Sequence, residues 1–251
     1  MNFSELDVLL SPAEYKSLPE LNLSQTCCVV FDVLRATSAI TVALANGAKE
    51  ILPCATIEEA IAARKSEPKL ILAGERKGQR INSKMSNGVE FDLGNSPREM
   101  TRQHVFGKKI ATTTTNGTNA LKACSGAGQV LIGSFINISI LKKTILNINS
   151  ERLLIVCAGT GEGTALEDTL GAGALCNLLW QKLKKVATPS AHLAYTLYRN
   201  NHMQLLHTVS GGKNARHLLA NSELAPDVQF CIKHDTHPVI GKMNTNGWIT
   251  V

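Results

Sequence analysis

Long apolar runs are absent from this 251-residue sequence, whose longest is the six residues 153–158. A bilayer-spanning helix needs roughly 18 or more apolar residues. The first 20 residues also lack the basic start and apolar stretch of a secretory signal, because Glu5, Asp7 and Glu14 fall where that stretch would lie. We therefore expect no transmembrane helix, no membrane partner and a cytoplasmic location.

Cysteine pairs with the spacing of a metal or redox site are absent as well, and aromatic residues are scarce. The seven cysteines form no Cys-x-x-Cys or Cys-x-x-His pair, which argues against a disulfide framework and a zinc site. The net charge is +6, but the basic residues are scattered and only 4% of residues are aromatic, so a nucleic-acid partner is not expected. We expect the positive charge to attract a small anionic substrate. The sequence leaves a homodimer open.

Apolar strands and helices alternate through the first two thirds of the chain. The predicted strands are Cys27–Val33, Glu50–Cys54, Leu70–Ala73, Lys109–Thr113, Gln129–Gly133 and Leu153–Ala158. The predicted helices between them are Ala36–Ala45, Ile57–Lys65, Pro97–Gln103, Asn119–Cys124, Ile136–Ile148 and Thr164–Leu183. This alternation predicts a single α/β domain over residues 1–251, with three α/β/α layers and a largely parallel, mixed central sheet.

The pattern changes after residue 186. Helices are predicted over Ala191–Leu206 and Asn214–Ala220, and Asn244–Gly247 has the composition of a hairpin turn before a last strand. We expect C-terminal helices and a hairpin at the edge of the sheet. Residues 187–251 belong either to the single domain or to a sub-lobe of it.

Polar residues directly follow the predicted strands, at the carboxyl ends where open α/β sheets bind ligands. Asp32 and Arg35 place a metal-seeking carboxylate beside a phosphate-seeking guanidinium. The alternative is a helix-starting Asp in a surface ion pair. Glu75 and Arg76 are either a second acid and base at this edge or a solvated charged pair.

Two further strand ends add groups suited to anions. Asp92 and Asn95 precede Ser96 and Pro97, which mark the start of a helix, and helix starts bind anions. The next strand runs into a hydroxyl-rich loop, which we interpret as an anion cradle rather than a plain turn. The polar residues of that loop are Thr114, Thr115, Asn116, Gly117 and Thr118.

A glycine-rich loop follows the strand at 153–158. Gly159 and Thr160 begin it, and its glycines let a ligand approach the backbone closely. Glu167 and Asp168 fall in the first turns of the next helix. The loop is not a G-x-G-x-x-G nucleotide motif, and no phosphate-binding P-loop occurs in the chain.

Familiar phosphatase signatures are missing. A Cys-based phosphatase has an Arg six residues after its nucleophile, but the residue six positions after Cys157 is Gly163. An enzyme of the haloacid dehalogenase type has a second acid two residues after the first, but the residue two positions after Asp32 is Leu34. The cluster His234–His237 lacks zinc-site spacing. The inventory of acids, two arginines and a hydroxyl loop instead suits magnesium and a doubly anionic small molecule.

Six ordered segments between about Cys28 and Ala174 carry a family resemblance: FDVLRATSAITVALANGA, GER, FDLGNSP, TTTNGTNAL, GSFIN and CAGTGE followed by LED. In these the chain resembles the 2-phosphosulfolactate phosphatase family. The resemblance implies a magnesium-dependent phosphatase that converts 2-phosphosulfolactate to sulfolactate on the route to coenzyme M. It also implies an α/β fold unrelated to the common phosphatase superfamilies. Another phosphorylated hydroxy acid is the alternative substrate.

From the resemblance and the strand-end clusters together we assign expected roles. The metal ligands are Asp32, Glu75, Asp92 and Asp168; the catalytic residues are Asp32, Arg35, Arg76 and Asp168; the substrate-binding residues are Asn95, Thr114, Thr115, Asn116, Gly117, Thr118, Asn137, Gly159 and Thr160. Attack by water, by Asp32 and by Cys157 all stay open. The rival hypothesis is a non-catalytic anion-binding or regulatory protein, which has little use for so many acids.

Overall fold

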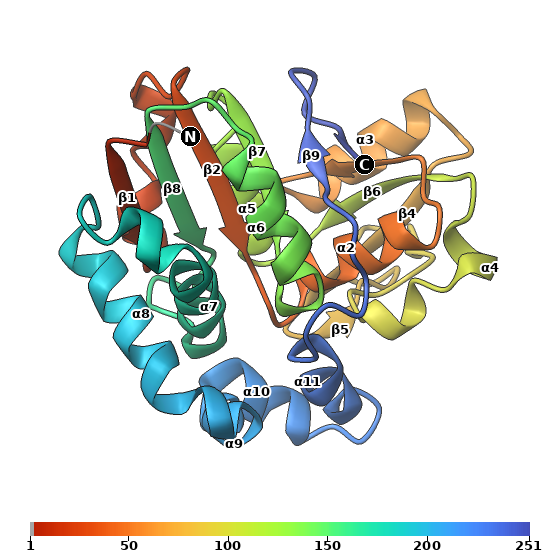
Figure 1. The fold of residues 1–251 in the computed structure, drawn as a ribbon. Helices are drawn as coiled ribbons and strands as arrows, with labels where there is room; N and C mark the ends of the chain where they lie inside the picture. Colours follow the sequence, from red (N-terminus) through yellow and green to blue (C-terminus); the bar gives the residue numbers. More distant parts are fainter. Residues whose placement is uncertain (1–2) are drawn as a thin grey trace.

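The computed structural model describes residues 3–251 and contains one large sheet. Its strands are β1 (Glu5–Leu9), β2 (Thr26–Phe31), β3 (Glu50–Pro53), β4 (Ile71–Arg76), β5 (Gln79–Arg80), β6 (Lys109–Thr113), β7 (Gln129–Gly133), β8 (Arg152–Cys157), β9 (Lys242–Met243) and β10 (Ile249–Thr250). They lie in the order β1-β8-β2-β7-β9-β10-β3-β6-β4-β5 (Figure 1). The pairings from β1 to β7, and those of β3 and β4 with β6, are parallel.

Helices cover the sheet and close its lower end in Figure 1. The α-helices are α1 (Pro12–Tyr15), α2 (Ala36–Ala45), α3 (Ile57–Ser66), α4 (Arg102–Val105), α5 (Gly117–Ala123), α6 (Ile138–Leu146), α7 (Leu166–Leu183), α8 (Pro189–Asn201), α9 (Leu205–Ser210), α10 (Lys213–Leu219) and α11 (Ala225–Cys231). Short 3-10 helices are η1 (Leu18–Glu20), η2 (Pro97–Glu99), η3 (Phe135–Asn137) and η4 (His202–Gln204). Among the described residues no helix is both long and apolar enough to span a membrane.

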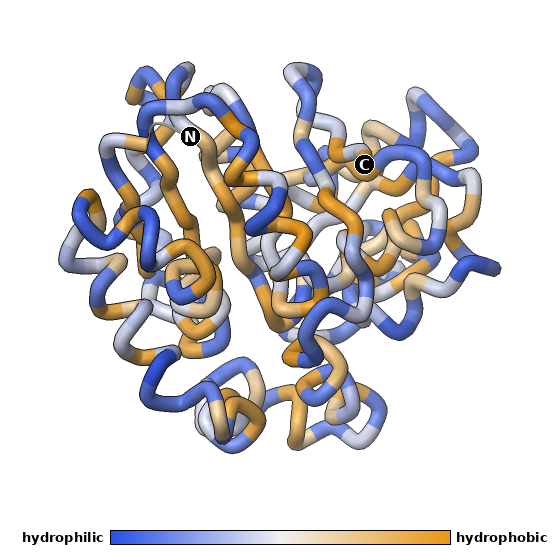
Figure 2. Tube along the Cα trace, viewed as in Figure 1, coloured by the Kyte–Doolittle hydropathy of each residue, from blue (hydrophilic) through white to orange (hydrophobic). Residues whose placement is uncertain are grey.

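Strand β2 shows why the molecule has three layers. Neighbouring side chains of a strand point to opposite faces, and here Val29 and Phe31 join the apolar cluster under α6, α7 and α8, whereas Cys28 and Val30 join the one under α2 and α5. All of β2 is buried, and its trace and that of β8 are hydrophobic along most of their length (Figure 2). The predicted α/β/α class with a mixed, mostly parallel sheet is confirmed.

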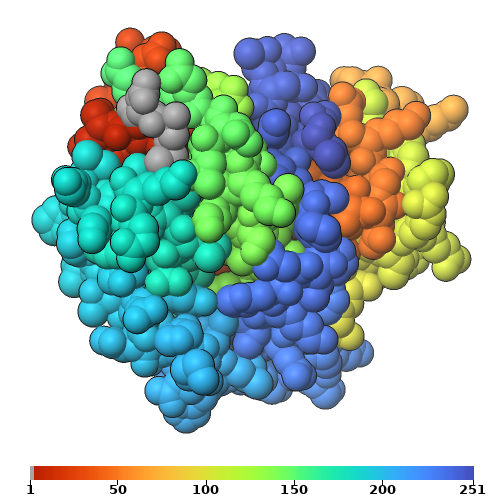
Figure 3. Space-filling model, in the orientation of Figure 1, coloured from red at the N-terminus to blue at the C-terminus, as the bar shows by residue number. Residues whose placement is uncertain are grey.

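The C-terminal hairpin lies in the middle of the sheet, so the predicted edge position is wrong. Met243 of β9 pairs with Val130 of β7, and Ile249 of β10 pairs with Ile51 of β3, antiparallel in both cases. The C-terminal residues accordingly fill the space between the segments coloured green and orange in Figure 3. Ile249 is fully buried. The outer positions belong to β1 and β5, and the hairpin instead satisfies the backbone groups of two half-sheets that would otherwise be unpaired.

Several other elements differ from the prediction. The helix expected over Pro97–Gln103 is split into η2 and α4. Strand β1 was not predicted, although Leu6 and Val8 alternate with polar residues and are buried against the sheet. Residues from 187 onward are spread over three places, since α8 packs along α7, α9 to α11 lie below the strands, and the hairpin lies within the sheet (Figure 1).

Candidate active site

A cavity of about 470 Å³ lies where the carboxyl ends of β2, β4, β6 and β8 meet the C-terminal helices. Eight residues predicted from the sequence line it: Asp32, Arg35, Glu75, Asn95, Thr115, Asn116, Gly159 and Thr160. Strand-end residues that are far apart in the chain converge here because the two half-sheets direct their carboxyl ends to one place. This volume suits a small molecule.

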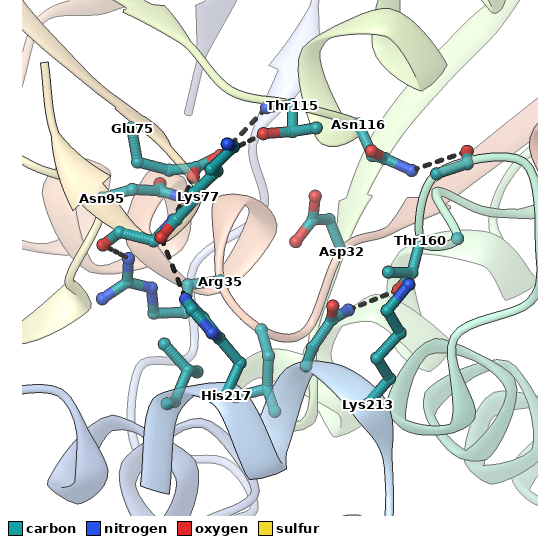
Figure 4. Close-up of a pocket in the computed structure, with 16 residues that line it drawn as sticks. Asp32, Arg35, Glu75, Lys77, Asn95, Thr115, Asn116, Thr160, Lys213 and His217 are labelled. Atoms are coloured by element: carbon teal, nitrogen blue, oxygen red, sulfur yellow. Dashed lines mark hydrogen bonds between the residues drawn. The ribbon is translucent and has the colours of Figure 1, made fainter. Parts of the chain in front are cut away.

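Asp32 stands at the centre of the cavity (Figure 4). Its Oδ1 accepts a 2.9 Å hydrogen bond from the backbone N–H of Ala36, at the start of α2, while Oδ2 has no hydrogen-bond partner among the described residues. A Cβ at position 117 would lie 2.4 Å from Oδ2, so Gly117 is required for this close approach. Burial raises the pKa of Asp32 from 3.8 to about 7, and the carboxylates of Glu75 and Glu167 act in the same direction. The arrangement favours a nearby cation.

Glu75 joins two loops of the cavity wall. Its Oε1 accepts hydrogen bonds from the backbone N–H and the hydroxyl of Thr115, at 2.9 and 3.0 Å, and its Oε2 accepts one from the N–H of Gly78 at 2.7 Å. Thr114 and Thr118 lie behind this wall, buried, and hydrogen-bond to each other. The conformation of the hydroxyl-rich loop thus depends largely on hydrogen bonds within the loop. Of its five residues 114–118, Thr115 and Asn116 line the cavity.

Arg35 is held from two sides. Its Nη1 forms a 2.8 Å ion pair with Asp227 of α11, and its Nη2 donates a 2.8 Å hydrogen bond to the carbonyl of Gly78 in the β4–β5 turn. The Arg35 side chain is only 3% exposed, yet the residue lines the cavity. Asp32 and Arg35 therefore line the same cavity, and Arg35 is not part of a surface ion pair.

Asp168 lies behind the cavity and links two loops. Its oxygens accept hydrogen bonds from the backbone N–H groups of Val33 and Gly159, at 2.8 and 3.0 Å. Glu167, the residue before it, accepts a 2.6 Å hydrogen bond from the side-chain amide of Asn214 through Oε1. The buried Oε2 of Glu167 has no hydrogen-bond partner among the described residues. Burial, together with the neighbouring carboxylates, raises the pKa of Asp168. Asp168 thus places the Asp32 loop against the glycine-rich loop rather than facing the ligand space.

Besides Asp168, Thr114, Gly117 and Thr118, four other residues named from the sequence do not line the cavity. Arg76 binds the carbonyl of Glu75 and the hydroxyl of Thr113, and Asp92 accepts from Arg64 and from the N–H of Leu72. Asn137 uses its amide to cap η3 and to hold the carbonyls of Ile132 and Val239. Cys157 is fully buried in the core and does not line the cavity, and burial raises the pKa of its thiol, which disfavours the thiolate that a nucleophile needs.

Most cavity residues outside the predicted set come from the β4–β5 turn, with Lys77 and Gly78, and from α10, with Lys213, Asn214, His217 and Leu218. Leu34 of the β2–α2 loop and Gly161 of the glycine-rich loop complete the lining. Asn214 donates 2.6 Å to the hydroxyl of Thr160, and His217 Nε2 lies 2.9 Å from the carbonyl of Lys77, so α10 is tied to both sides of the cavity (Figure 4). The glycine pair before Lys213 was the one local signal that could have drawn attention to this helix.

Lys77 and Lys213 stand on opposite sides of the opening (Figure 4). Neither forms an ion pair with a carboxylate of residues 3–251. Both residues are exposed. Two unpaired ammonium groups at the mouth of a cavity favour an anionic ligand.

The carboxylates of the cavity are suited to a magnesium ion that is held by few protein ligands. Within residues 3–251 no group of three or more Asp, Glu, His or Cys side chains is placed to hold a metal ion. Magnesium, however, is usually bound by one or two carboxylates, several waters and the phosphate of a substrate. Asp32, whose Oδ2 has no hydrogen-bond partner among the described residues, and Glu75 both line the cavity and meet that requirement, whereas Asp92 and Asp168 do not line it.

Comparison with known proteins gives one consistent family. A family model described as 2-phosphosulpholactate phosphatase matches residues 13–246. A protein of Caldanaerobacter subterraneus subsp. tengcongensis is 37% identical over 240 residues, covering 91% of this chain and 92% of its own. One from Clostridium acetobutylicum is 36% identical, covering 98% and 99%. Both carry the name "Probable 2-phosphosulfolactate phosphatase". The match spans every strand-end loop of the cavity, and the chain therefore belongs to the 2-phosphosulfolactate phosphatase family, a family of phosphoric monoester hydrolases.

Proposed function

We propose that this protein hydrolyses 2-phosphosulfolactate to sulfolactate and phosphate, with magnesium as its metal ion. One observation carries the proposal: Asp32, buried with a free oxygen, lies beside Arg35 in a cavity with two unpaired lysines at its mouth. A small molecule with a phosphate and a second anionic group complements this charge pattern. The names of the related proteins support the same substrate.

Asp32 and Glu75 would hold magnesium together with the substrate phosphate. The bound metal would neutralise charge on the phosphoryl oxygens and make phosphorus more electrophilic. Arg76, Asp92 and Asp168, which the sequence suggested as further catalytic or metal-binding groups, have no such part in the proposal. Their side chains are engaged elsewhere.

Arg35 would stabilise the charge that develops on the phosphoryl group, since positioning and electrostatics supply most of the catalysis in phosphoryl transfer. Lys77 and Lys213 would bind the sulfonate or carboxylate of the substrate, with Asn95 and Asn116 as neutral groups lining the same cavity. Gly159 and Thr160 border this space from the glycine-rich loop. Asn137, Thr114 and Thr118 lie outside it and shape the loops.

Two routes to the product differ in the nucleophile. In one, water attacks phosphorus and sulfolactate leaves; in the other, the Asp32 carboxylate attacks first and water then hydrolyses the acyl phosphate. Labelled phosphate retained on acid-quenched enzyme, and lost in Asp32→Asn, identifies the second route. Complete release of label into solution at every time identifies the first.

The function is tested by phosphate release from racemic 2-phosphosulfolactate, phospholactate and phosphoglycolate, in magnesium and in EDTA. We expect magnesium-dependent release that is fastest from the sulfonate. Release only from the other two esters would retain the chemistry and reject the substrate. No release from any of them would reject the enzyme and leave the anion-binding protein.

A further inference from the structure

Asp227 is a fully buried carboxylate outside the cavity, and it joins three separate parts of the site. It comes from α11, in the C-terminal helices. Its Oδ2 accepts from Nη1 of Arg35 at 2.8 Å, and its Oδ1 accepts from Nε of Arg98 at 2.7 Å and from the hydroxyl of Ser96 at 2.8 Å. Neither the sequence pattern nor the strand-end rule points to this residue.

The contacts fix the direction of the Arg35 guanidinium. Asp227 holds Nη1 and the carbonyl of Gly78 holds Nη2, so the planar group is clamped between α11 and the β4–β5 turn. A free arginine side chain has many rotamers and loses rotamer entropy when it is ordered. Here that ordering is complete before any ligand enters, and preorganised groups stabilise a transition state without reorganising.

The charges around Asp227 do not cancel. One carboxylate faces two guanidinium groups, those of Arg35 and Arg98, which leaves one net positive charge. The Arg98 side chain is 40% exposed and partly solvated, whereas that of Arg35 is 3% exposed and borders the cavity. The positive charge that a phosphate would meet at this wall is therefore that of Arg35.

Building on the proposed phosphatase function, we propose that Asp227 is a positioning residue that holds Arg35 in its productive orientation and thereby makes α11 a working part of the active site. The residue does not touch the substrate. Its effect on the reaction passes through Arg35.

Asp227→Asn keeps the shape of the side chain and removes its charge. We expect kcat/KM for phosphate release to fall about 100-fold, mostly through kcat, as for other misplacements of about 1 Å in an active site. We also expect affinity for inorganic phosphate, measured by calorimetry, to fall about tenfold. In an Arg35→Ala background the same substitution should change either quantity less than about threefold, because the group through which it acts is gone.

Arg98→Met is the matched control, since it breaks the other ion pair of the same carboxylate without touching Arg35. It should lower the melting temperature and leave kcat/KM within about threefold of the wild type. If Asp227→Asn is too unstable to purify, Asp227→Glu, which retains the charge with a shifted position, enters the same cycle. An Asp227→Asn enzyme with wild-type kcat/KM and phosphate affinity, or losses that multiply in the double variant, would overturn the proposal. If the wild type hydrolyses none of the esters, the proposed function is rejected. The affinities of the wild type, the two single variants and the double variant for inorganic phosphate then decide the role of Asp227 on their own.

Discussion

The strand-end loops and the C-terminal helices border the same cavity with different chemistry. The loops after β2, β4, β6 and β8 supply carboxylates, hydroxyls and glycines, most of them hydrogen-bonded to one another. Helices α10 and α11 supply Lys213, Asn214, His217 and the buried Asp227. In the proposed function the sheet provides the groups that act at the phosphoryl centre, whereas the helices provide a cation for the opposite end of the substrate and the support for Arg35.

This difference teaches where the charge balance of the site comes from. The strand ends alone would gather Asp32, Glu75, Glu167 and Asp168 with few cations, an arrangement that burial makes costly. Arg35 reaches the cavity from the β2 loop but is oriented from α11, 192 residues away in sequence. The following variants separate the contributions of the two regions.

The largest effect is expected for Asp32→Asn. Loss of the proposed metal ligand should lower kcat/KM about 1,000-fold, at the upper end for a single electrostatic group in an active site. Phosphate release in magnesium measures it. Asn119→Asp, at an exposed position on α5, serves as a control for the fold. Activity within tenfold of the wild type would remove Asp32 from the chemistry.

Asp32→Asn should also change how the stability of the folded protein depends on pH. The folded pKa of Asp32, about 7, lies above its ordinary 3.8, so the unfolded chain releases this proton first as the pH rises. The wild type therefore loses stability relative to Asp32→Asn between about pH 4 and pH 7, and the difference levels off above that range. Thermal melts at fixed salt measure it. A melting-temperature difference that does not change with pH would contradict the raised pKa.

Arg35→Ala should lower kcat/KM about 100- to 1,000-fold, equivalent to about 2.7–4 kcal/mol of transition-state stabilisation. Arg35→Lys should restore only a small part, because a lysine cannot reproduce the forked contact with Asp227 and Gly78. Steady-state kinetics with 2-phosphosulfolactate provide the test. Near wild-type kcat/KM for Arg35→Ala would show that the guanidinium does not act on the phosphoryl group.

Lys213→Ala should have a smaller effect, a rise of about 3- to 10-fold in KM with little change in kcat, since an exposed charge contributes modestly to binding. The effect should appear with 2-phosphosulfolactate and vanish with phenyl phosphate, which has no second anionic group. Lys184→Ala, an exposed lysine at the end of α7, is the matched control. Equal losses on both esters would assign Lys213 to the phosphate instead.

Asn137→Ala should have the smallest effect on activity, within about threefold, because its amide binds only backbone groups of η3, β7 and Val239. The free energy of unfolding should fall by about 1–3 kcal/mol, the cost of leaving buried polar groups unsatisfied. Urea unfolding and phosphate release are measured on the same preparation. A large loss of activity at unchanged stability would return Asn137 to the binding site.

Local patterns predicted the strand-end half of the site and not the helical half. Asp32 and Thr115 follow strands and Glu75 lies at the end of one, and the rule that ligands bind at carboxyl ends brings them together. Asn95 reaches the same cavity from the loop before η2. Asn137 also follows a strand, β7, but its amide satisfies backbone groups, a competition that spacing does not reveal. The contacts of Asn214 with Thr160 and of Asp227 with Arg35 span 54 and 192 residues, beyond any local pattern.

The fold shows the same limit. Strands β6 and β7 and helix α2 have their predicted bounds, because burial on two faces and helical periodicity are local properties. The position of the two-residue strands β9 and β10 between β7 and β3 depends instead on which sheet edges are left open. An apolar Ile249 fits an edge or a centre equally well until the neighbouring strands are in place.

The central claim is that the cavity around Asp32 and Arg35 is a magnesium-dependent phosphatase site for a doubly anionic ester. Its most direct test is the initial rate of phosphate release from 2-phosphosulfolactate by the wild type and by Asp32→Asn, each in magnesium and in EDTA. The account predicts rapid release only for the wild type in magnesium. Equal rates for the two proteins, or a wild-type rate that EDTA leaves unchanged, would contradict it.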